Sequence, residues 1–226
     1  SWIEFGNRLL TFVLVLAAVV VVLSVLAAGR KELRGLALGQ ILGIFGQGVL
    51  GGITVLTGLH PATVAAHFLL SIILIAGATS LRAQRHAPSE KIQAPVLVKK
   101  IATAHIFVTF LVLILGTVVT GSGPHAGDAT APRFPFDLRT VAWLHADVVI
   151  ALLGITFGLF VVSDVSTQTK KRLKIFLAIA LSQGLIGYVQ WFTDLPEILV
   201  GLHLAGSTLV WIASWRIWLS VTTKNG

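Results

Sequence analysis

The sequence predicts an all-α polytopic membrane protein made of two related halves. Of its 226 residues, 55% are hydrophobic and only 12% are charged, and the mean hydropathy is +0.90. A water-soluble domain needs more polar surface than this composition provides. The apolar runs are about 20 residues long, which is the length of helix that crosses a bilayer, whereas barrel strands would be shorter and would alternate.

These runs predict transmembrane helices, taken here in chain order. They cover residues 8–29, 36–57, 61–81, 98–120, 140–163, 173–193 and 197–220. The segment after the third run contains Pro88, Pro95 and mixed charges, which favours a boundary there. We therefore expect an N-terminal half-bundle at 1–82, a cytoplasmic linker at 83–97 and a C-terminal four-helix bundle at 98–226.

An internal repeat relates the two halves at a fixed offset of 136 residues. The identical pairs are Gln47/Gln183, Gly48/Gly184, Gly51/Gly187, Thr57/Thr193, Leu59/Leu195, Val64/Val200, His67/His203 and Ser71/Ser207. An even number of spans per copy gives parallel copies related by an axis along the membrane normal. The second copy has one more predicted helix than the first. We thus expect two parallel four-helix-bundle repeats, with the first helix of repeat one missing and lying upstream of Ser1.

The net charge of +8 is concentrated in alternate loops. The basic loops hold Arg30, Lys31 and Arg34, then Arg82, Arg85, Lys91, Lys99 and Lys100, then Lys170, Lys171, Arg172 and Lys174. The loops between them hold only Arg133 and Arg139, beside acidic residues. This positive-inside pattern predicts a multi-pass protein of the cell membrane with Ser1 outside and Gly226 in the cytoplasm. It favours the lipid bilayer over nucleic acid as the partner of the basic residues.

Three histidines, His67, His145 and His203, lie at similar depth inside apolar helices, where ionisable groups usually mark a site. His67 and His203 lie about six residues into their spans, hence about 9 Å deep, and His145 lies at similar depth on another helix. Two histidines at matching height, His145 and His203, suit the two axial positions of one haem held between helices. A hydrogen-bonded structural role is the alternative for each. Zinc is disfavoured because no thiolate, carboxylate or third histidine joins the pair.

The first copy offers a less complete ligand set. Asn7 matches His145 by rank on its helix, and asparagine is a poor haem ligand, so His67 would face an open or replaceable position. Glu4 lies three residues before Asn7 and shares its helical face. Its carboxylate could transfer protons beside a haem edge or cap the helix N-terminus. Arg8 could pair with a haem propionate, with Glu4 or with a lipid headgroup.

Other polar features allow a structural interpretation. His60, His86, His105 and His125 are expected to be structural or solvated, although His125 lies in the lid-like loop 121–139. Small residues crowd two helices, which indicates close packing or, alternatively, clearance for a flat macrocycle. A polar stripe of Gln40, Gln47 and Thr54, repeated at Gln183 and Gln190, would serve interhelical hydrogen bonds or line a cofactor cleft.

Taken together, these motifs resemble the haem A synthase family, and most closely its actinobacterial branch. The resembling segments are 2–8 (WIEFGNR), 48–55 (GVLGGITV), 66–71 (AHFLLS), 119–128 (VTGSGPHAGD), 144–147 (LHAD) and 201–204 (GLHL). They cover nearly the whole chain and are specific jointly. The resemblance implies an eight-span fold of two four-helix halves whose first span is missing here.

The resemblance also implies a function. It implies haem b bound by His145 and His203, and haem O bound in the first half with His67 as a ligand. Members of the family oxidise the C8 methyl group of haem O to the formyl group of haem A for cytochrome oxidase, using a glutamate that matches Glu4. Haem O synthase and cytochrome oxidase assembly factors are then the expected protein partners.

Two departures from the family pattern matter. Many members have histidine where this chain has Asn7, and many carry a cysteine pair in a loop that would precede Ser1. The rival hypotheses are a non-enzymatic haem b electron carrier of the diheme quinone-linked type and a transporter built on parallel repeats.

Overall fold

The computed structural model describes residues 2–85, 94–124, 130–162 and 165–222, and for residues 2–5, 7 and 8 the backbone alone. All regular structure in these residues is helical. The helices are α1 (Trp2–Ala27), α2 (Arg34–Leu56), α3 (Pro61–Ala83), α4 (Val96–Ser122), α5 (Leu138–Val161), α6 (Thr167–Phe192) and α7 (Glu197–Thr222), with a short 3-10 helix (Lys31–Leu33) before α2. These seven long helices are each long and apolar enough to cross a membrane, so the chain is a multi-pass membrane protein.

Capping residues explain where several helices begin. Pro61 opens α3 behind His60, whose Nδ1 accepts a hydrogen bond from the Ala62 amide at 3.3 Å. The expected start of α6 at 173 is wrong, because that helix begins at Thr167, where the Ser166 side chain accepts from the Thr169 amide at 3.1 Å. Basic residues in the first turns lower the hydropathy there without preventing the helix. Likewise α1 begins at Trp2 rather than at 8.

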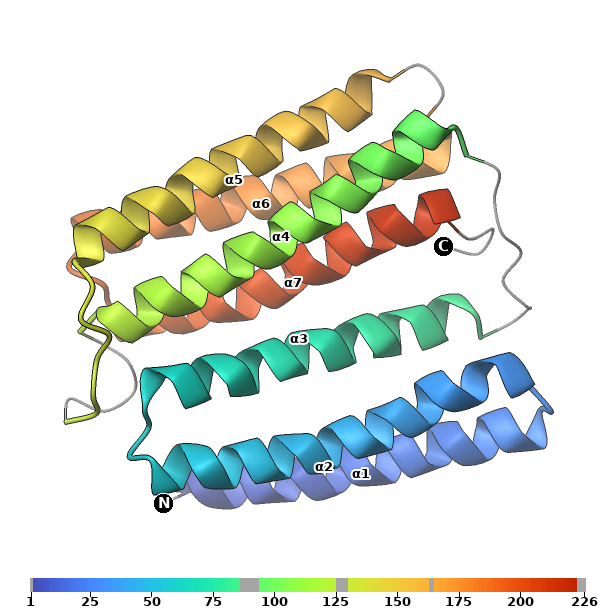
Figure 1. Ribbon diagram of the computed structural model, residues 1–226, viewed down its shortest axis with the longest axis horizontal. Helices are drawn as coiled ribbons and strands as arrows, with labels where there is room; N and C mark the ends of the chain where they lie inside the picture. The colour runs from blue at the N-terminus through green and yellow to red at the C-terminus, as the bar shows by residue number, and fades with distance from the viewer. Residues whose placement is uncertain (1, 86–93, 125–129, 163–164, 223–226) are drawn as a thin grey trace.

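The helices run up and down in two groups (Figure 1). Helices α4 to α7 form a bundle, and α3 lies between this bundle and the pair α1 and α2. We call the end at which α1, α3, α5 and α7 begin the histidine end. The opposite end, at which α2, α4 and α6 begin, is the basic end. Consecutive helices are antiparallel, so side chains near the start of α3, α5 and α7 all lie at the histidine end.

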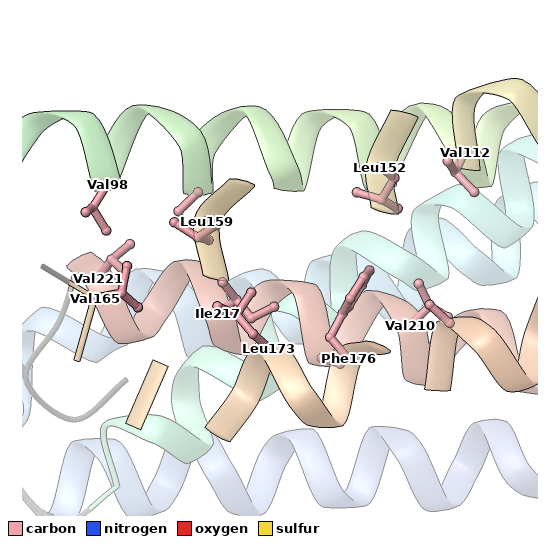
Figure 2. Close-up of a cluster of buried hydrophobic side chains, with 13 residues drawn as sticks. Val98, Val112, Leu152, Leu159, Val165, Leu173, Phe176, Val210, Ile217 and Val221 are labelled. Atoms are coloured by element: carbon pink, nitrogen blue, oxygen red, sulfur yellow. The ribbon is translucent and has the colours of Figure 1, made fainter. Parts of the chain in front are cut away.

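The largest buried cluster lies inside the bundle of α4 to α7 (Figure 2). Each of the four helices contributes, and the fully buried side chains include Val98, Leu159, Phe176 and Ile217. Between helices in lipid, such contacts stabilise through close packing, because the lipid is as apolar as the protein interior. The bundle is therefore a rigid frame for any side chains placed between its helices.

Tryptophans on α7 attach α3 to this bundle. The indole N–H of Trp211 donates to the Ile72 carbonyl at 2.8 Å, and that of Trp215 donates to Ser80 Oγ, also at 2.8 Å. The Trp211 ring also packs on Phe110 of α4, with centroids 5.7 Å apart. These contacts set the height of α3 relative to α7, and each of these two helices carries one of the repeated histidines.

The turns that precede α3 and α7 share one backbone conformation. Leu59 and Leu195 have φ of 58°, and the residues before them, Gly58 and Asp194, have φ of 60° and 55°. In each turn the leucine amide donates to the carbonyl five residues earlier at 2.9 Å. A leucine in the left-handed region costs about 1–2 kcal/mol. The strained turn thus occurs twice, at the repeat offset, and each time it sets the start of a histidine-bearing helix.

Candidate functional site

The three predicted histidines lie at similar distances from the starts of their helices. His67 is the seventh residue of α3, His203 the seventh of α7 and His145 the eighth of α5. At a rise of 1.5 Å per residue, each lies about 10 Å into its helix from the histidine end. All three side chains are half-buried.

Each repeated histidine packs against a glycine of the preceding helix. A Cβ atom placed on Gly51 of α2 would lie 3.6 Å from Cε1 of His67, and one on Gly187 of α6 would lie 3.7 Å from Cε1 of His203. These four residues are related by the repeat offset. Any side chain at either glycine, that of alanine included, would therefore occupy the space beside the imidazole.

His145 joins the second of these sites from another direction. A Cβ atom on Gly116 of α4 would lie 3.4 Å from Cε1 of His145. His145 and His203 belong to two helices of the same bundle, α5 and α7, and lie at similar distances from its histidine end. The bundle thus brings together two imidazoles, from α5 and α7, with glycines of α4 and α6 beside them.

The same three imidazoles each have a buried nitrogen without a partner. The Nδ1 atoms of His67, His145 and His203 make no hydrogen bond, although backbone of Val112 and Gln183 lies beside the His145 and His203 rings. An unsatisfied buried polar atom costs about 1–3 kcal/mol. Nitrogens left open at such a cost are more typical of ligand-binding imidazoles than of imidazoles that stabilise a fold.

Glutamines of the polar stripe contact the histidine-bearing helices. Gln47 donates from Nε2 to the His67 carbonyl at 3.0 Å and to Ser71 Oγ at 2.7 Å. Its counterpart Gln183 of α6 packs its side-chain amide against α7, since a Cβ atom on Gly206 would come within 2.0 Å of its Nε2. Both glutamines nevertheless keep a buried Oε1 atom without a partner. Interhelical hydrogen bonding accounts for the amide nitrogen of Gln47 but not for its Oε1 atom.

His105 has the opposite environment. It is fully buried between helices, and its Nδ1 lies 3.0 Å from Ser214 Oγ while its Nε2 lies 3.1 Å from Thr156 Oγ1. Its ring also packs edge-on against Phe176, with centroids 4.6 Å apart. Because both nitrogens are satisfied, His105 holds α4, α5 and α7 together, in line with the structural role expected for it.

The remaining predicted residues are placed less completely. Glu4, Asn7 and Arg8 lie in the first two turns of α1, at the histidine end, and their side chains lie outside the described part of the structure. His86 and His125 also lie outside the described residues. His60 caps α3, and its ring packs edge-on against Phe134.

Sequence reasoning did not identify Gly116 as a site residue. Gly51 and Gly187 each precede a histidine by the same spacing in both copies, which was a usable signal. The position 136 residues before Gly116 would precede Ser1, so no repeated counterpart could draw attention to it.

The arrangement fits haem. Two imidazoles from different helices can supply both axial ligands, and glycines beside them leave room for a flat macrocycle. The Nδ1 atoms of these histidines have no partners, as expected for imidazoles whose hydrogen bonds are completed only when a ligand binds. Among the described residues, no group of three or more His, Asp or Glu side chains could hold a metal ion by itself.

The fold and site thus define a multi-pass helical membrane protein with paired intramembrane histidines. Residues 1–137 match the COX15-CtaA family, described as cytochrome oxidase assembly protein. The chain belongs to this family, whose members are haem A synthases. The match includes Glu4, Asn7, Arg8 and His67 and ends before α5. No curated protein and no solved structure was found to match the chain.

Proposed function

We propose that the protein is a haem A synthase, which converts the C8 methyl group of haem O to the formyl group of haem A for cytochrome oxidase. Family membership supports this function. The observation that carries it is the repeated pairing of an intramembrane histidine with a glycine on the neighbouring helix, His67 with Gly51 and His203 with Gly187. One such pairing is common packing, whereas two at the repeat offset indicate two related binding sites.

The C-terminal site is proposed to hold haem b. His145 and His203 would be its axial ligands, because they come from two helices of one bundle, α5 and α7, at similar distances from its histidine end. Haem b, when bound, supplies a one-electron redox centre. The chain itself orients the two imidazoles through α5 and α7 and keeps the space beside them open through Gly116 and Gly187.

The N-terminal site is proposed to take haem O as substrate. His67 would be an iron ligand, and Asn7 would leave the opposite position incompletely ligated. Glu4 shares a helical face with Asn7 at the start of α1, and it would move a proton at the reacting edge of the substrate. Arg8 would pair with a propionate of haem O.

The proposal includes the arrangement of the chain. Residues 1–82 and 98–226 would be the two halves, joined by a linker at 83–97, and the repeated left-handed turn before α3 and α7 supports this division. The basic end would face the cytoplasm and the histidine end the outside of the cell membrane. Haem O synthase would deliver the substrate, and cytochrome oxidase assembly factors would receive haem A.

The test is conversion of haem O by the full-length protein in a membrane that makes haem O but no haem A. The extracted haems are identified by mass. The wild type should yield haem A, and Glu4→Ala should bind haem O yet accumulate it or a hydroxylated intermediate. Glu32→Ala, which removes a carboxylate at the basic end, is the matched control and should yield haem A normally.

The alternatives give different results in the same preparation. A non-enzymatic diheme carrier would contain haem b alone and leave haem O unchanged. A transporter would show no Soret band. Normal haem A yield from Glu4→Ala would remove Glu4 from the mechanism while leaving the enzymatic function in place.

A further inference from the structure

Two pairs of unsatisfied atoms occur at equivalent places in the two halves. In the first half they are Oε1 of Gln47 and Nδ1 of His67, and in the second half Oε1 of Gln183 and Nδ1 of His203. An amide oxygen can only accept a hydrogen bond. A neutral imidazole that binds a metal through Nε2 carries its proton on Nδ1 and can only donate there. The two atoms of each pair are therefore complementary once a metal is bound.

The glutamines lie at the histidine-bearing helix in both halves. The amide nitrogen of Gln47 is 3.0 Å from the carbonyl oxygen of His67 itself. In the second half the Gln183 amide covers Gly206, three residues after His203, and the Gln183 backbone lies beside the His203 ring. The unsatisfied acceptor and the unsatisfied imidazole nitrogen thus belong to the same helix-helix contact each time.

We propose that Gln47 and Gln183 are positioning residues, whose Oε1 atoms accept a hydrogen bond from Nδ1–H of His67 and His203 when haem iron occupies Nε2. This inference rests on the proposed haem-binding function. Ligating histidines nearly always donate their second ring N–H to an acceptor, which fixes the ring orientation and raises the basicity of the ligand. The repeated glutamine supplies that acceptor from the neighbouring helix.

The hydrogen bond has a measurable electronic consequence. A more basic imidazole stabilises ferric over ferrous iron and so lowers the midpoint potential of the haem. Gln183→Leu removes the acceptor and should raise the potential of haem b. Gln183→Glu provides a stronger acceptor and should lower it. A residue that merely holds two helices together would not produce shifts of opposite sign.

Redox titration of the purified full-length protein tests this, with the Soret and α bands as readout. The wild type, Gln183→Leu and Gln183→Glu are compared, and haem b retention in Gln183→Leu should fall about 10-fold to 100-fold. Gln40→Leu is the matched control, because Gln40 also packs its amide against a glycine of α3, Gly77, without a neighbouring site histidine. It should leave both haem potentials unchanged.

A second pair of variants moves the glutamines without altering them. A Cβ atom on Gly206 would come within 2.0 Å of Gln183 Nε2, and one on Gly77 within 2.2 Å of Gln40 Nε2. Gly206→Ala must therefore displace the Gln183 amide and should raise the haem b potential as Gln183→Leu does. Gly77→Ala displaces the Gln40 amide equally and should not change the potential.

The outcomes separate the inference from the function on which it rests. Wild-type protein with haem b but unchanged potentials in Gln183→Leu and Gln183→Glu would overturn the inference and assign the acceptor to the Gln183 backbone carbonyl. Shifts of the haem potential of the same size in Gln40→Leu would also overturn it, since they would reflect a general loosening of the helix packing. Purified wild type with no Soret band would overturn the proposed function itself, and the inference with it.

Discussion

His105 and His203 belong to the same four-helix bundle, yet their surroundings differ in kind. Around His105, Thr156 donates its proton to the Leu152 carbonyl at 2.7 Å, so Nε2 of the imidazole must donate to Thr156 while Nδ1 accepts from Ser214. His203 has a buried Nδ1 with no partner and a glycine beside its ring.

The contrast separates two uses of a histidine inside the membrane. An imidazole that stabilises a fold is satisfied in the folded protein alone, because hydroxyl groups can donate or accept as its tautomer requires. An imidazole kept for a ligand retains an unsatisfied nitrogen and open space until the ligand arrives. The position of a histidine within an apolar helix does not distinguish these uses, whereas its hydrogen bonds do.

Replacing a site histidine gives the largest expected effect. His203→Ala and His145→Ala should each abolish the low-spin haem b spectrum, because one axial ligand cannot hold the haem in that state. The unfolding free energy of the haem-free protein should change by no more than about 1 kcal/mol, since an unsatisfied nitrogen leaves with the ring. Absorption spectra and unfolding in mixed micelles measure the two quantities. A normal low-spin spectrum in both variants would show that the ligand assignment is wrong.

Replacing His105 should have the reverse effect. His105→Ala removes the ring that joins the hydroxyls of Ser214 and Thr156, and it opens a cavity against Phe176. We expect a loss of roughly 2–4 kcal/mol in the unfolding free energy. The protein that remains folded should keep its low-spin haem b spectrum. If His105→Ala removed the haem without loss of stability, His105 rather than His203 would be the better ligand candidate.

The sequence predicts the number of long helices well and their ends less well. Apolar run length is a direct consequence of bilayer thickness, so all seven runs correspond to helices. The start predicted for α6 is wrong by six residues. Hydropathy falls over Lys170 and Lys171, but the Ser166 cap still starts the helix before them.

The site shows a similar limit. The repeat makes His67 and His203 conspicuous, and their shared spacing from Gly51 and Gly187 is visible in the sequence. The satisfied state of His105 is not visible, because its partners are 51 and 109 residues away in the chain. Only the packing of three helices brings those hydroxyls to the ring.

Two glycines of α2 differ in the same way. Gly43 allows close packing between helices, whereas Gly51 leaves space beside a site histidine. A Cβ atom on Gly43 would lie 2.1 Å from Cδ2 of Leu74, so Gly43→Ala should displace that side chain and cost roughly 1–3 kcal/mol in unfolding free energy. A Cβ atom on Gly51 would make ordinary contact with the His67 ring at 3.6 Å. Gly51→Ala should therefore leave stability nearly unchanged and reduce haem O occupancy. If Gly51→Ala lowered the unfolding free energy and kept normal haem O occupancy, while Gly43→Ala did the reverse, the role given to Gly51 would be contradicted.

The smallest effect concerns the start of α5, the helix that carries both His145 and Thr156. Asp137 Oδ2 accepts from the Thr140 amide at 2.8 Å and from Thr140 Oγ1 at 2.7 Å. The hydrogen bonds from the Thr140 side chain and backbone, with a smaller contribution from Arg139, lower the pKa of the Asp137 carboxyl below its usual value of 3.8. A carboxyl whose pKa is lower in the folded state contributes stability above its unfolded pKa.

That contribution is lost as the pH falls through the folded-state pKa. Wild-type stability should thus decline below about pH 4 partly through Asp137, and Asp137→Asn, which keeps a capping oxygen, should remove this part of the pH dependence. Asp137→Ala should destabilise the protein more at neutral pH than in acid. The cap lies two turns from His145 and five turns from Thr156. Loss of the cap should therefore affect haem b binding at His145 more than the hydrogen bond between Thr156 and His105. Unfolding in micelles from pH 3 to 7, with the haem spectrum followed in parallel, measures both. An identical pH dependence in the wild type and Asp137→Asn would exclude the cap as the source.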